Sequence, residues 1–233
     1  GEEQRCVEIA DMATWLPYGG FSSSVVVDHR FAYPLPANMP SEYAAVLMCA
    51  GITVYSSLRP YSGVPSRKIA ILGVGGLGHL AIQFAHSMGY DVTVISTSAD
   101  KRDQAFAYGA DDFFLSTDRP TYLKHLFSFD LVLCTATGNV PWNVLLNIPK
   151  KGGRIILVGF PDMDMNPTDL VAHDLSITGS FLGNCETMHE MLAFAHANSI
   201  TPMVEIMPMS AVNEAIQRVR ENKARYRIVL VNE

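Results

Sequence analysis

Several features are missing from this 233-residue sequence, and each absence narrows the class of protein that it can encode. No apolar run reaches the roughly 20 residues that a membrane-spanning helix needs. The first ten residues, GEEQRCVEIA, lack the basic and then apolar pattern of a secretory signal. Lys and Arg number 17 against 23 Asp and Glu, with no basic block, and the formal net charge is −6. We therefore expect neither a membrane nor a nucleic acid as a partner.

Paired-cysteine patterns are also missing. The four cysteines, Cys6, Cys49, Cys134 and Cys185, lie far apart, and no two of them form a C-x-x-C pair. This spacing does not resemble the disulfide framework of a secreted protein, so we expect a reducing, cytoplasmic compartment. The chain does have a composition that is 48% hydrophobic and 17% charged, which is typical of a globular protein with a sizeable core.

Short apolar strands alternate with amphipathic helices through the middle of the chain. We expect helices over residues 76–88 and 101–108, and strands at 68–73, 91–96, 112–116, 129–134, 153–159 and 175–180. Strands that are apolar throughout and separated by helices are typical of a parallel sheet with helices on both faces. The sequence therefore predicts an α/β fold with a doubly wound parallel sheet.

The flanking segments have a different pattern. Before the alternating region we expect a turn and a strand within residues 19–28, a proline-rich loop over 33–40 and a helix capped by Ser41. A further helix follows Gly51. After the alternating region, the pattern predicts a helix at 186–197, a strand at 203–209, a helix at 210–222 and a final strand at 226–231.

A glycine-rich string, ILGVGGLGH, joins the first central strand to the helix after it. Gly73, Gly75 and Gly78 have the G-x-G-x-x-G spacing. In dinucleotide-binding proteins the first glycine permits a tight turn, the second lets the backbone approach a pyrophosphate, and the third allows close packing of helix and strand. The helix start then faces the phosphates. The alternative is an ordinary strand–helix turn whose glycines serve no ligand.

The end of the next strand indicates which dinucleotide would bind. An NAD site usually has Asp or Glu here to hold the ribose hydroxyls, whereas this sequence has Ser96, Thr97 and Ser98, followed by Lys101. Hydroxyls and an ammonium can bind the 2′-phosphate that a carboxylate would repel, so the pattern favours NADP(H). Asp100 is the exception, and its alternative role is to cap the helix ahead of Lys101. The alternative for Lys101 and the cation after it is a solvated helix face.

A longer string, LMCAGITVYSSLRPYSGVPSRKIAILGVGGLGHLAIQFAHSMGYDVTVIST, resembles the zinc-containing medium-chain dehydrogenase/reductases, in their cinnamyl alcohol dehydrogenase branch. The similarity extends over nearly the whole chain, and the C-A-G-I-T motif with G-V-G-G-L-G-H after it is especially specific. The resemblance implies a Rossmann sheet flanked by parts of an incomplete β-rich GroES-like catalytic domain. It also implies an NADP(H)-dependent alcohol dehydrogenase, in which a catalytic zinc acts as a Lewis acid while aldehyde and alcohol substrates are interconverted.

The resemblance assigns roles to individual residues. It makes Cys49 and Thr53 the catalytic positions, with Cys49 as the last ligand of the catalytic zinc and Thr53 beside the nicotinamide. Cys6 matches the last of four cysteines that hold a structural zinc. The pyrophosphate loop corresponds to Gly73, Val74, Gly75, Gly76, Leu77 and Gly78. The 2′-phosphate pocket corresponds to Ser96, Thr97, Ser98 and Lys101. Further cofactor contacts correspond to Thr135, Gly159, Ser180, Phe181 and Leu182.

The sequence departs from the family in its N-terminal part. The family carries the other zinc ligands and the proton relay in a segment that has no counterpart here, and one cysteine cannot hold a four-coordinate zinc. Both metal sites are therefore expected to be incomplete. We expect a remnant of the catalytic domain at residues 1–50, an NADP-binding domain at 51–182, and a segment at 183–233 that returns to the catalytic domain.

Two functions remain open. In the first, the sequence is part of a longer NADP(H)-dependent alcohol dehydrogenase, as the start at Gly1 and the isolated Cys6 indicate. In the second, the chain is a catalytically inactive NADP(H)-binding fragment or pseudoenzyme without zinc, and Cys49 is an ordinary buried small hydrophobe. A zinc-free quinone reductase relative is a further variant, which the two cysteines disfavour. In each case the missing strands would leave apolar edges exposed, so we expect a homodimer or other self-association.

Overall fold

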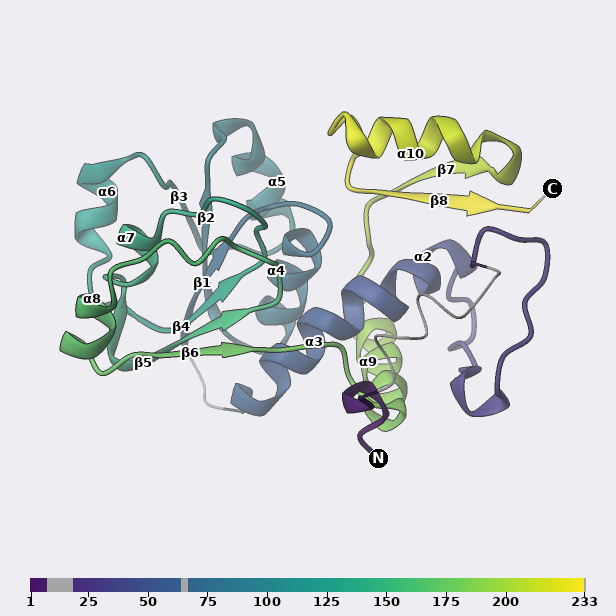
Figure 1. Ribbon diagram of the computed structural model, residues 1–233, viewed down its shortest axis with the longest axis horizontal. Coiled ribbons are helices and arrows are strands. Elements are labelled where there is room, and N and C mark those ends of the chain that lie inside the picture. Colours follow the sequence, from purple (N-terminus) through teal and green to yellow (C-terminus); the bar gives the residue numbers. More distant parts are fainter. Residues whose placement is uncertain (8–18, 64–66, 233) are drawn as a thin grey trace. The chain divides into compact units, whose positions relative to one another are not determined.

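The computed structural model describes residues 1–7, 19–63 and 67–232, which form two compact units (Figure 1). The sheet unit is Thr53–Phe181, and the split unit combines Gly1–Ile52 with Leu182–Glu233. Within the described ranges, no helix combines the length and the apolar character that a membrane crossing requires. The assignment of residues 1–50 and 183–233 to a catalytic domain stays a prediction, and residues 8–18 of that assignment are not among those described.

The sheet unit is built on six parallel strands. They are β1 (Lys68–Leu72), β2 (Asp91–Ser96), β3 (Asp112–Leu115), β4 (Phe129–Cys134), β5 (Pro149–Leu157) and β6 (Ser176–Gly179). The strands pair in the order β3-β2-β1-β4-β5-β6, and every pair is parallel. The chain therefore runs from β1 to one edge of the sheet, returns to the centre at β4, and continues to the other edge. The doubly wound α/β fold expected from the sequence is confirmed.

Helices connect these strands. They are α4 (Gly78–Ser87), α5 (Arg102–Ala107), α6 (Arg119–Lys124), α7 (Trp142–Leu145) and α8 (Pro167–Ala172), with α3 (Ile52–Leu58) ahead of β1. Short 3-10 turns follow α3 at Arg59–Tyr61 and precede α5 at Ala99–Lys101. The helix expected over 101–108 therefore begins as a 3-10 turn and becomes regular only at Arg102.

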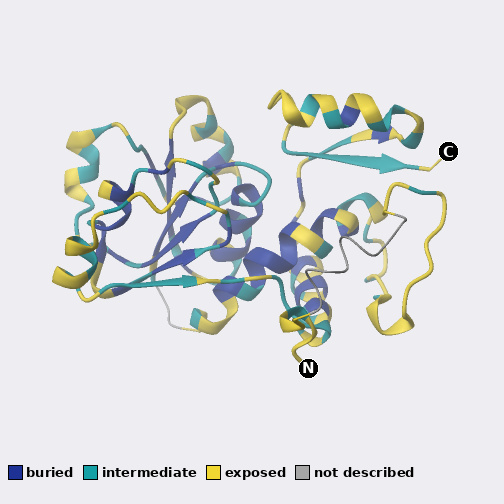
Figure 2. Ribbon diagram, viewed as in Figure 1, coloured by how far each residue is buried: buried dark blue, intermediate teal, exposed yellow. Residues whose placement is uncertain are grey.

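The central strands are buried along nearly their whole length (Figure 2). Alternate side chains of a strand point to opposite faces of a sheet. From one face, Ala70 and Leu72 of β1 join a core cluster that includes Phe114, Phe129 and Trp142. Helices cover the other face too, so the alternate residues Ile69 and Ile71 of β1 are also apolar and buried. This double burial explains the continuous apolar runs in the sequence.

A pair of contacts fixes α3 beside α4. The rings of Tyr55 and Phe84 meet edge to face, with their centroids 5.6 Å apart. The Tyr90 hydroxyl, just after α4, donates to the Leu58 carbonyl oxygen at 3.1 Å. Burial raises the pKa of Tyr90 to about 12, so this hydroxyl keeps its proton and remains a donor at neutral pH. The helix that carries Thr53 is thereby tied to the sheet unit.

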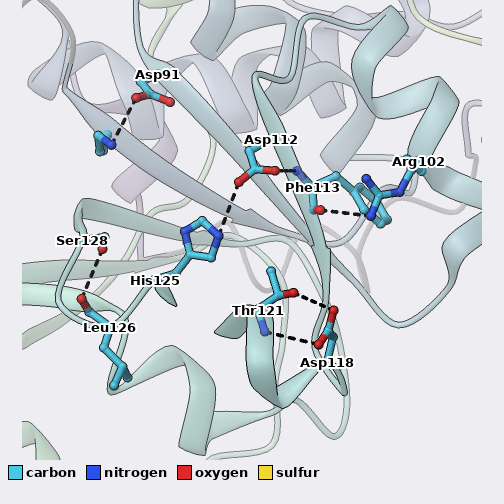
Figure 3. A network of polar contacts seen from close by, with 10 residues as sticks. Asp91, Arg102, Asp112, Phe113, Asp118, Thr121, His125, Leu126 and Ser128 are labelled. Atoms are coloured by element: carbon cyan, nitrogen blue, oxygen red, sulfur yellow. Dashed lines mark hydrogen bonds and ion pairs between the residues drawn. The ribbon is translucent and has the colours of Figure 1, made fainter. Parts of the chain in front are cut away.

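Figure 3 shows how α6 is fixed next to β3. Asp118 caps α6, because its carboxylate accepts from the Thr121 N–H at 3.2 Å and from the Thr121 hydroxyl at 2.7 Å. The same two hydrogen bonds lower the pKa of Asp118. At the other end of α6, the His125 ring stacks on Phe114 with centroids 4.8 Å apart, and its Nε2 lies 3.3 Å from Asp112 Oδ2. Both ends of this short helix are therefore anchored.

The split unit is mainly helical. It contains α2 (Ser41–Val46), a π-helical turn at Leu47–Gly51 that continues into α3, α9 (Cys185–Ala197), β7 (Val204–Pro208), α10 (Val212–Arg220) and β8 (Arg227–Val231). Short 3-10 turns lie at Glu3–Arg5, His29–Phe31 and Met209–Ala211. Strands β7 and β8 pair in parallel as a two-stranded sheet. Pro40 rather than Ser41 is the N-cap of α2, so Ser41 is its first helical residue.

The strand expected within residues 19–28 is wrong. This segment belongs to neither of the sheets in the described part of the chain, and it forms bends at 20–23 followed by irregular coil. Val25, Val26 and Val27 are 63%, 100% and 56% exposed. An extended apolar segment becomes a strand only where a neighbouring strand supplies hydrogen-bond partners.

Asp130 of β4 links three neighbouring strands at the amino edge of the sheet. Its carboxylate accepts from the Lys68 N–H of β1 and from the Lys150 ammonium of β5, each at 2.9 Å. Burial raises the pKa of Asp130, but the hydrogen bonds from Lys150 and Lys68 outweigh it and hold the pKa below its usual value. The stability that the carboxylate contributes is therefore present above its unfolded pKa of about 4, and is lost as the pH falls through the lower folded value.

We expect Asp130→Asn to lower the free energy of unfolding by about 1 kcal/mol at neutral pH, because a charge-assisted, partly exposed contact is lost. As the pH falls below about 4, the variant should lose less further stability than the wild type does. Urea unfolding at several pH values measures both effects, with the exposed loop acid Asp164→Asn as the control. Equal acid sensitivity in the wild type and Asp130→Asn would contradict this account.

Candidate functional site

The carboxyl ends of the parallel strands gather residues that the sequence singled out. Since every strand of the sheet points the same way, these ends share one edge. The strand order reverses between β1 and β4, and ligands of doubly wound sheets bind at such a reversal. Residues expected to contact a cofactor follow or end five strands at this edge: Gly73, Ser96, Thr135, Gly159 and Ser180. The structure thus brings together positions that are up to about a hundred residues apart in the sequence.

Gly73 and Gly78 are required by the packing of the loop after β1. Gly73 has φ of +98°, a backbone conformation that side chains disfavour, and its N–H donates to the Ile95 carbonyl oxygen of β2 at 2.9 Å. Gly78 begins α4, and a Cβ added there would stand 2.0 Å from the Gly73 carbonyl oxygen. The turn and the start of the helix therefore depend on these two glycines.

Gly75 differs from its neighbours. A Cβ added at Gly75 would meet no atom within 4 Å, so nothing in the protein requires a glycine here. The backbone instead borders open space at the start of α4, where the helix dipole favours an anion. This is the fit expected for a pyrophosphate that approaches the backbone closely. It favours the dinucleotide loop over an ordinary turn with incidental glycines.

Two side chains, those of Thr135 and His79, hold the loop through hydrogen bonds to backbone carbonyl oxygens. The Thr135 hydroxyl donates to the Leu72 carbonyl oxygen at 2.8 Å, and a Cβ on Gly73 would stand 2.9 Å from that hydroxyl oxygen. His79 is fully buried, and its Nδ1 lies 2.8 Å from the Gly75 carbonyl oxygen. Because a carbonyl oxygen only accepts, Nδ1 carries the proton in this contact. Thr135 and His79 therefore hold the loop against β4 and α4.

The end of β2 holds a cluster of hydroxyls and charges. Ser96 is 5% exposed, and its Oγ accepts from the Ser98 N–H at 3.1 Å. The Ser98 hydroxyl donates to the Asp100 carboxylate, and Lys101 Nζ lies 4.0 Å from Asp100 Oδ2. Thr97 is exposed beside them. The hydroxyls and the ammonium expected to hold a 2′-phosphate are thus close together, with one acid among them.

One interpretation of this segment is wrong. Asp100 is not a helix cap, because it lies inside the 3-10 turn Ala99–Lys101, and neither that turn nor α5 has a side-chain cap. Arg102 is exposed on α5, as expected for a solvated helix face, but it also makes contacts. Its Nη2 donates to the Phe113 carbonyl oxygen at 3.3 Å, and its guanidinium lies 4.8 Å from the Phe113 ring centre (Figure 3). Sequence reasoning missed the contact of Asp100 with Ser98, although the acid lies only two residues beyond the hydroxyl.

The remaining expected positions differ in accessibility. Thr53 is 8% exposed in the first turn of α3. Gly159 is required by packing, since an added Cβ would stand 2.1 Å from the Ala136 carbonyl oxygen. Phe181 is 58% exposed at the end of the sheet unit, whereas Leu182 belongs to the split unit.

Cys49 lies in the split unit, on the π-helical turn Leu47–Gly51. It is exposed, so its interpretation as a buried hydrophobe is wrong. The residue borders a hollow of about 280 Å³ whose lining includes Phe21, Val46, Met209, Arg227 and Ile228. π-Helical turns of this kind often mark functional positions.

The described residues do not by themselves fit a zinc ion. Cys6 and Cys49 are both exposed. Across residues 1–7, 19–63 and 67–232, no three His, Cys, Asp or Glu side chains lie close enough together to hold one metal ion. A structural zinc takes four protein ligands and a catalytic zinc three.

Comparison with protein families gives a match over most of the sheet unit and on into α9. The family described as "Zinc-binding dehydrogenase" matches residues 76–197, just over half of the 233. The match begins within the glycine loop and ends with α9.

Individual relatives are similar over most of this chain but extend beyond it. The probable formaldehyde dehydrogenase AdhA of Bacillus subtilis is 39% identical over 215 residues, covering 91% of this chain and 62% of that protein. NADP-dependent alcohol dehydrogenase C 1 of Mycolicibacterium smegmatis is 37% identical with the same coverage of 91% and 62%. The structure of a cinnamyl alcohol dehydrogenase from Sorghum bicolor, SbCAD4, matches with a TM-score of 0.79 at 34% identity, over 84% of this chain and 57% of that one. The chain thus spans less than two thirds of the length of these relatives.

The glycine loop predicts a contrast between two alanine variants. Gly78→Ala should lower the free energy of unfolding by about 1–3 kcal/mol, because the added methyl group overlaps the Gly73 carbonyl oxygen. Gly75→Ala should change it by less than about 0.5 kcal/mol, because the methyl group enters open space. Thermal and urea unfolding measure both values. Losses of equal size would contradict the close approach of α4 to β1.

Proposed function

The chain belongs to the zinc-binding dehydrogenase family, and on that premise we propose that its sheet unit binds NADP(H) for hydride transfer between NADPH and an aldehyde. The loop at Gly75 carries the proposal, because its backbone borders open space at the strand reversal where a dinucleotide would lie. The product of the proposed reduction is an alcohol. The reaction is proposed for the whole protein, since the relatives are longer than this chain.

The residues at the end of β2 support NADP(H) over NAD(H). A 2′-phosphate carries about −1.5 to −2 charges near neutral pH, and it needs donors rather than a carboxylate on the strand. Ser96, Thr97, Ser98 and Lys101 provide hydroxyls and an ammonium there. The Mycolicibacterium smegmatis relative is described as NADP-dependent, which agrees with this proposal.

Each part of the edge has a separate task in the proposed site. The start of α4 stabilises the pyrophosphate through its dipole, while Thr135 and His79 keep the loop in place. The hydroxyls at the end of β2 orient the adenosine half. The bound nicotinamide supplies the hydride, and the protein supplies orientation and electrostatics.

A second candidate function is NADP(H) binding without catalysis. The described residues contain no cluster of three metal-ligating side chains, so they do not by themselves supply a zinc site for the reaction. The chain would then bind NADP(H) without turnover, as a cofactor-binding part of a longer enzyme or as an inactive relative.

Two measurements on this chain separate these functions. NADPH binding is followed by the change in nicotinamide fluorescence, and turnover by aldehyde-dependent NADPH oxidation with added zinc and a panel of aromatic and aliphatic aldehydes. Turnover would support the dehydrogenase reaction. Binding without turnover would support the cofactor-binding function, and the absence of NADPH binding would contradict both.

We expect Ser96→Asp to weaken NADPH binding at least about tenfold more than NADH binding, because the new carboxylate repels the 2′-phosphate. The matched control is Ser96→Asn, which has nearly the same shape without the charge. Both affinities come from fluorescence titration. Equal losses of NADPH and NADH affinity in Ser96→Asp would refute the 2′-phosphate assignment.

We also propose that the chain self-associates through an exposed segment with apolar side chains. Val25, Val26 and Val27 are consecutive and exposed, and unpaired apolar segments favour pairing with another chain. Sedimentation velocity over a range of concentrations should show dimers or larger species, and Val26→Asp should reduce them. A wild-type chain that remains a monomer at all concentrations would count against this proposal.

A further inference from the structure

We propose that Asp100 is a specificity-determining residue that competes with the 2′-phosphate of NADP(H) for the Ser98 hydroxyl and the Lys101 ammonium. The inference rests on the proposed function, because it concerns how the same nucleotide site chooses its ligand. It assigns to Asp100 the opposite effect to that of its neighbours: they favour the phosphate, and the acid opposes it.

The contacts at the end of β2 carry this inference. The Ser98 hydroxyl donates to Asp100 Oδ1, and Lys101 Nζ lies 4.0 Å from Asp100 Oδ2. The two oxygens of one carboxylate therefore face a hydroxyl donor and a cation, which are the groups that bind a phosphate. Asp100 places its own anionic group where the nucleotide would place another.

The turn after β2 has its own hydrogen bond, so the proposed competition involves side chains. Ser96 Oγ accepts from the Ser98 N–H at 3.1 Å, which holds the turn after β2. The Lys101 side chain is 23% exposed and that of Asp100 is 57% exposed. Asp100 is therefore the more exposed of the two, and its carboxylate can turn into solvent when a phosphate takes its donors.

The cost of this exchange depends on charge. A carboxylate within about 6 Å of a phosphate that carries nearly two negative charges opposes its binding even in a water-like dielectric. NADH has a hydroxyl in place of that phosphate, so the acid repels it little. Asp100 thereby narrows the preference for NADP(H) that the hydroxyls and Lys101 create.

The test uses Asp100→Asn, which removes the charge and keeps the shape, with Asp100→Ala as a second variant. Isothermal titration with NADPH, NADH and 2′,5′-ADP gives the affinities without any need for turnover, and 2′,5′-ADP isolates the phosphate contact. Both variants should bind NADPH and 2′,5′-ADP about tenfold more tightly than the wild type, with NADH changed less than about twofold. Raising the salt concentration should reduce the gain.

Asp103→Asn is the matched control. Asp103 is an exposed acid in the first turn of α5, so this variant removes the same charge outside the cluster. It should change each affinity less than about twofold. Thermal unfolding of each variant checks that the exposed substitutions leave the fold intact.

The outcomes separate this inference from the proposed function. If the wild type binds NADPH but neither Asp100 variant binds it more tightly, the role of Asp100 is overturned while the cofactor site stands. A large loss of NADH affinity in Asp100→Asn would also overturn it, because the acid would then hold the ribose hydroxyls. A wild type that binds no nucleotide contradicts the proposed function and this inference with it.

Discussion

One backbone contact allows α4 to begin immediately beyond β1. A side chain at position 78 would place its Cβ 2.0 Å from the Gly73 carbonyl oxygen, so the helix can start there only with glycine. The same loop packs against Thr135, whose hydroxyl donates to the Leu72 carbonyl oxygen at 2.8 Å. The carboxyl ends of β1 and β4 are thus joined by this contact, and the loop between β1 and α4 borders open space at Gly75. The pyrophosphate binding proposed for this edge of the sheet depends on that arrangement of the loop.

The central strands could be predicted because their burial on both faces leaves continuous apolar runs in the sequence. In β1, the four successive residues from Ile69 to Leu72 are apolar and buried, because neighbouring residues face two covered surfaces. The segment at 19–28 also contains an apolar run, Val25 to Val27, but a strand needs a partner as well, which no local pattern encodes. Val26 is fully exposed instead. Asp100 was misinterpreted for a related reason. Capping and side-chain pairing use the same residue types at the same spacing, so only the three-dimensional contact with Ser98 distinguishes them.

The two units contribute unequally to the proposed chemistry. The sheet unit holds the glycine loop, the hydroxyl cluster and the strand reversal that a dinucleotide needs. The split unit holds Cys49 beside a hollow that Arg227 also lines, and the described residues contain no group of three His, Cys, Asp or Glu side chains that could hold a metal ion. Family membership therefore supports the cofactor half of a dehydrogenase most strongly. The chain spans 62% of the length of the Bacillus subtilis relative, so the reaction of a whole dehydrogenase stays a proposal.

The most direct test of the central claim is a map of backbone amide NMR shifts during titration of the chain with NADPH. Because the pyrophosphate and the 2′-phosphate are assigned to separate turns, the largest shifts should fall in two segments, Gly73–Gly78 and Ser96–Lys101. Titration with NADH should reproduce the first set and reduce the second. Shifts confined to other residues, or none in the glycine loop, would contradict the account.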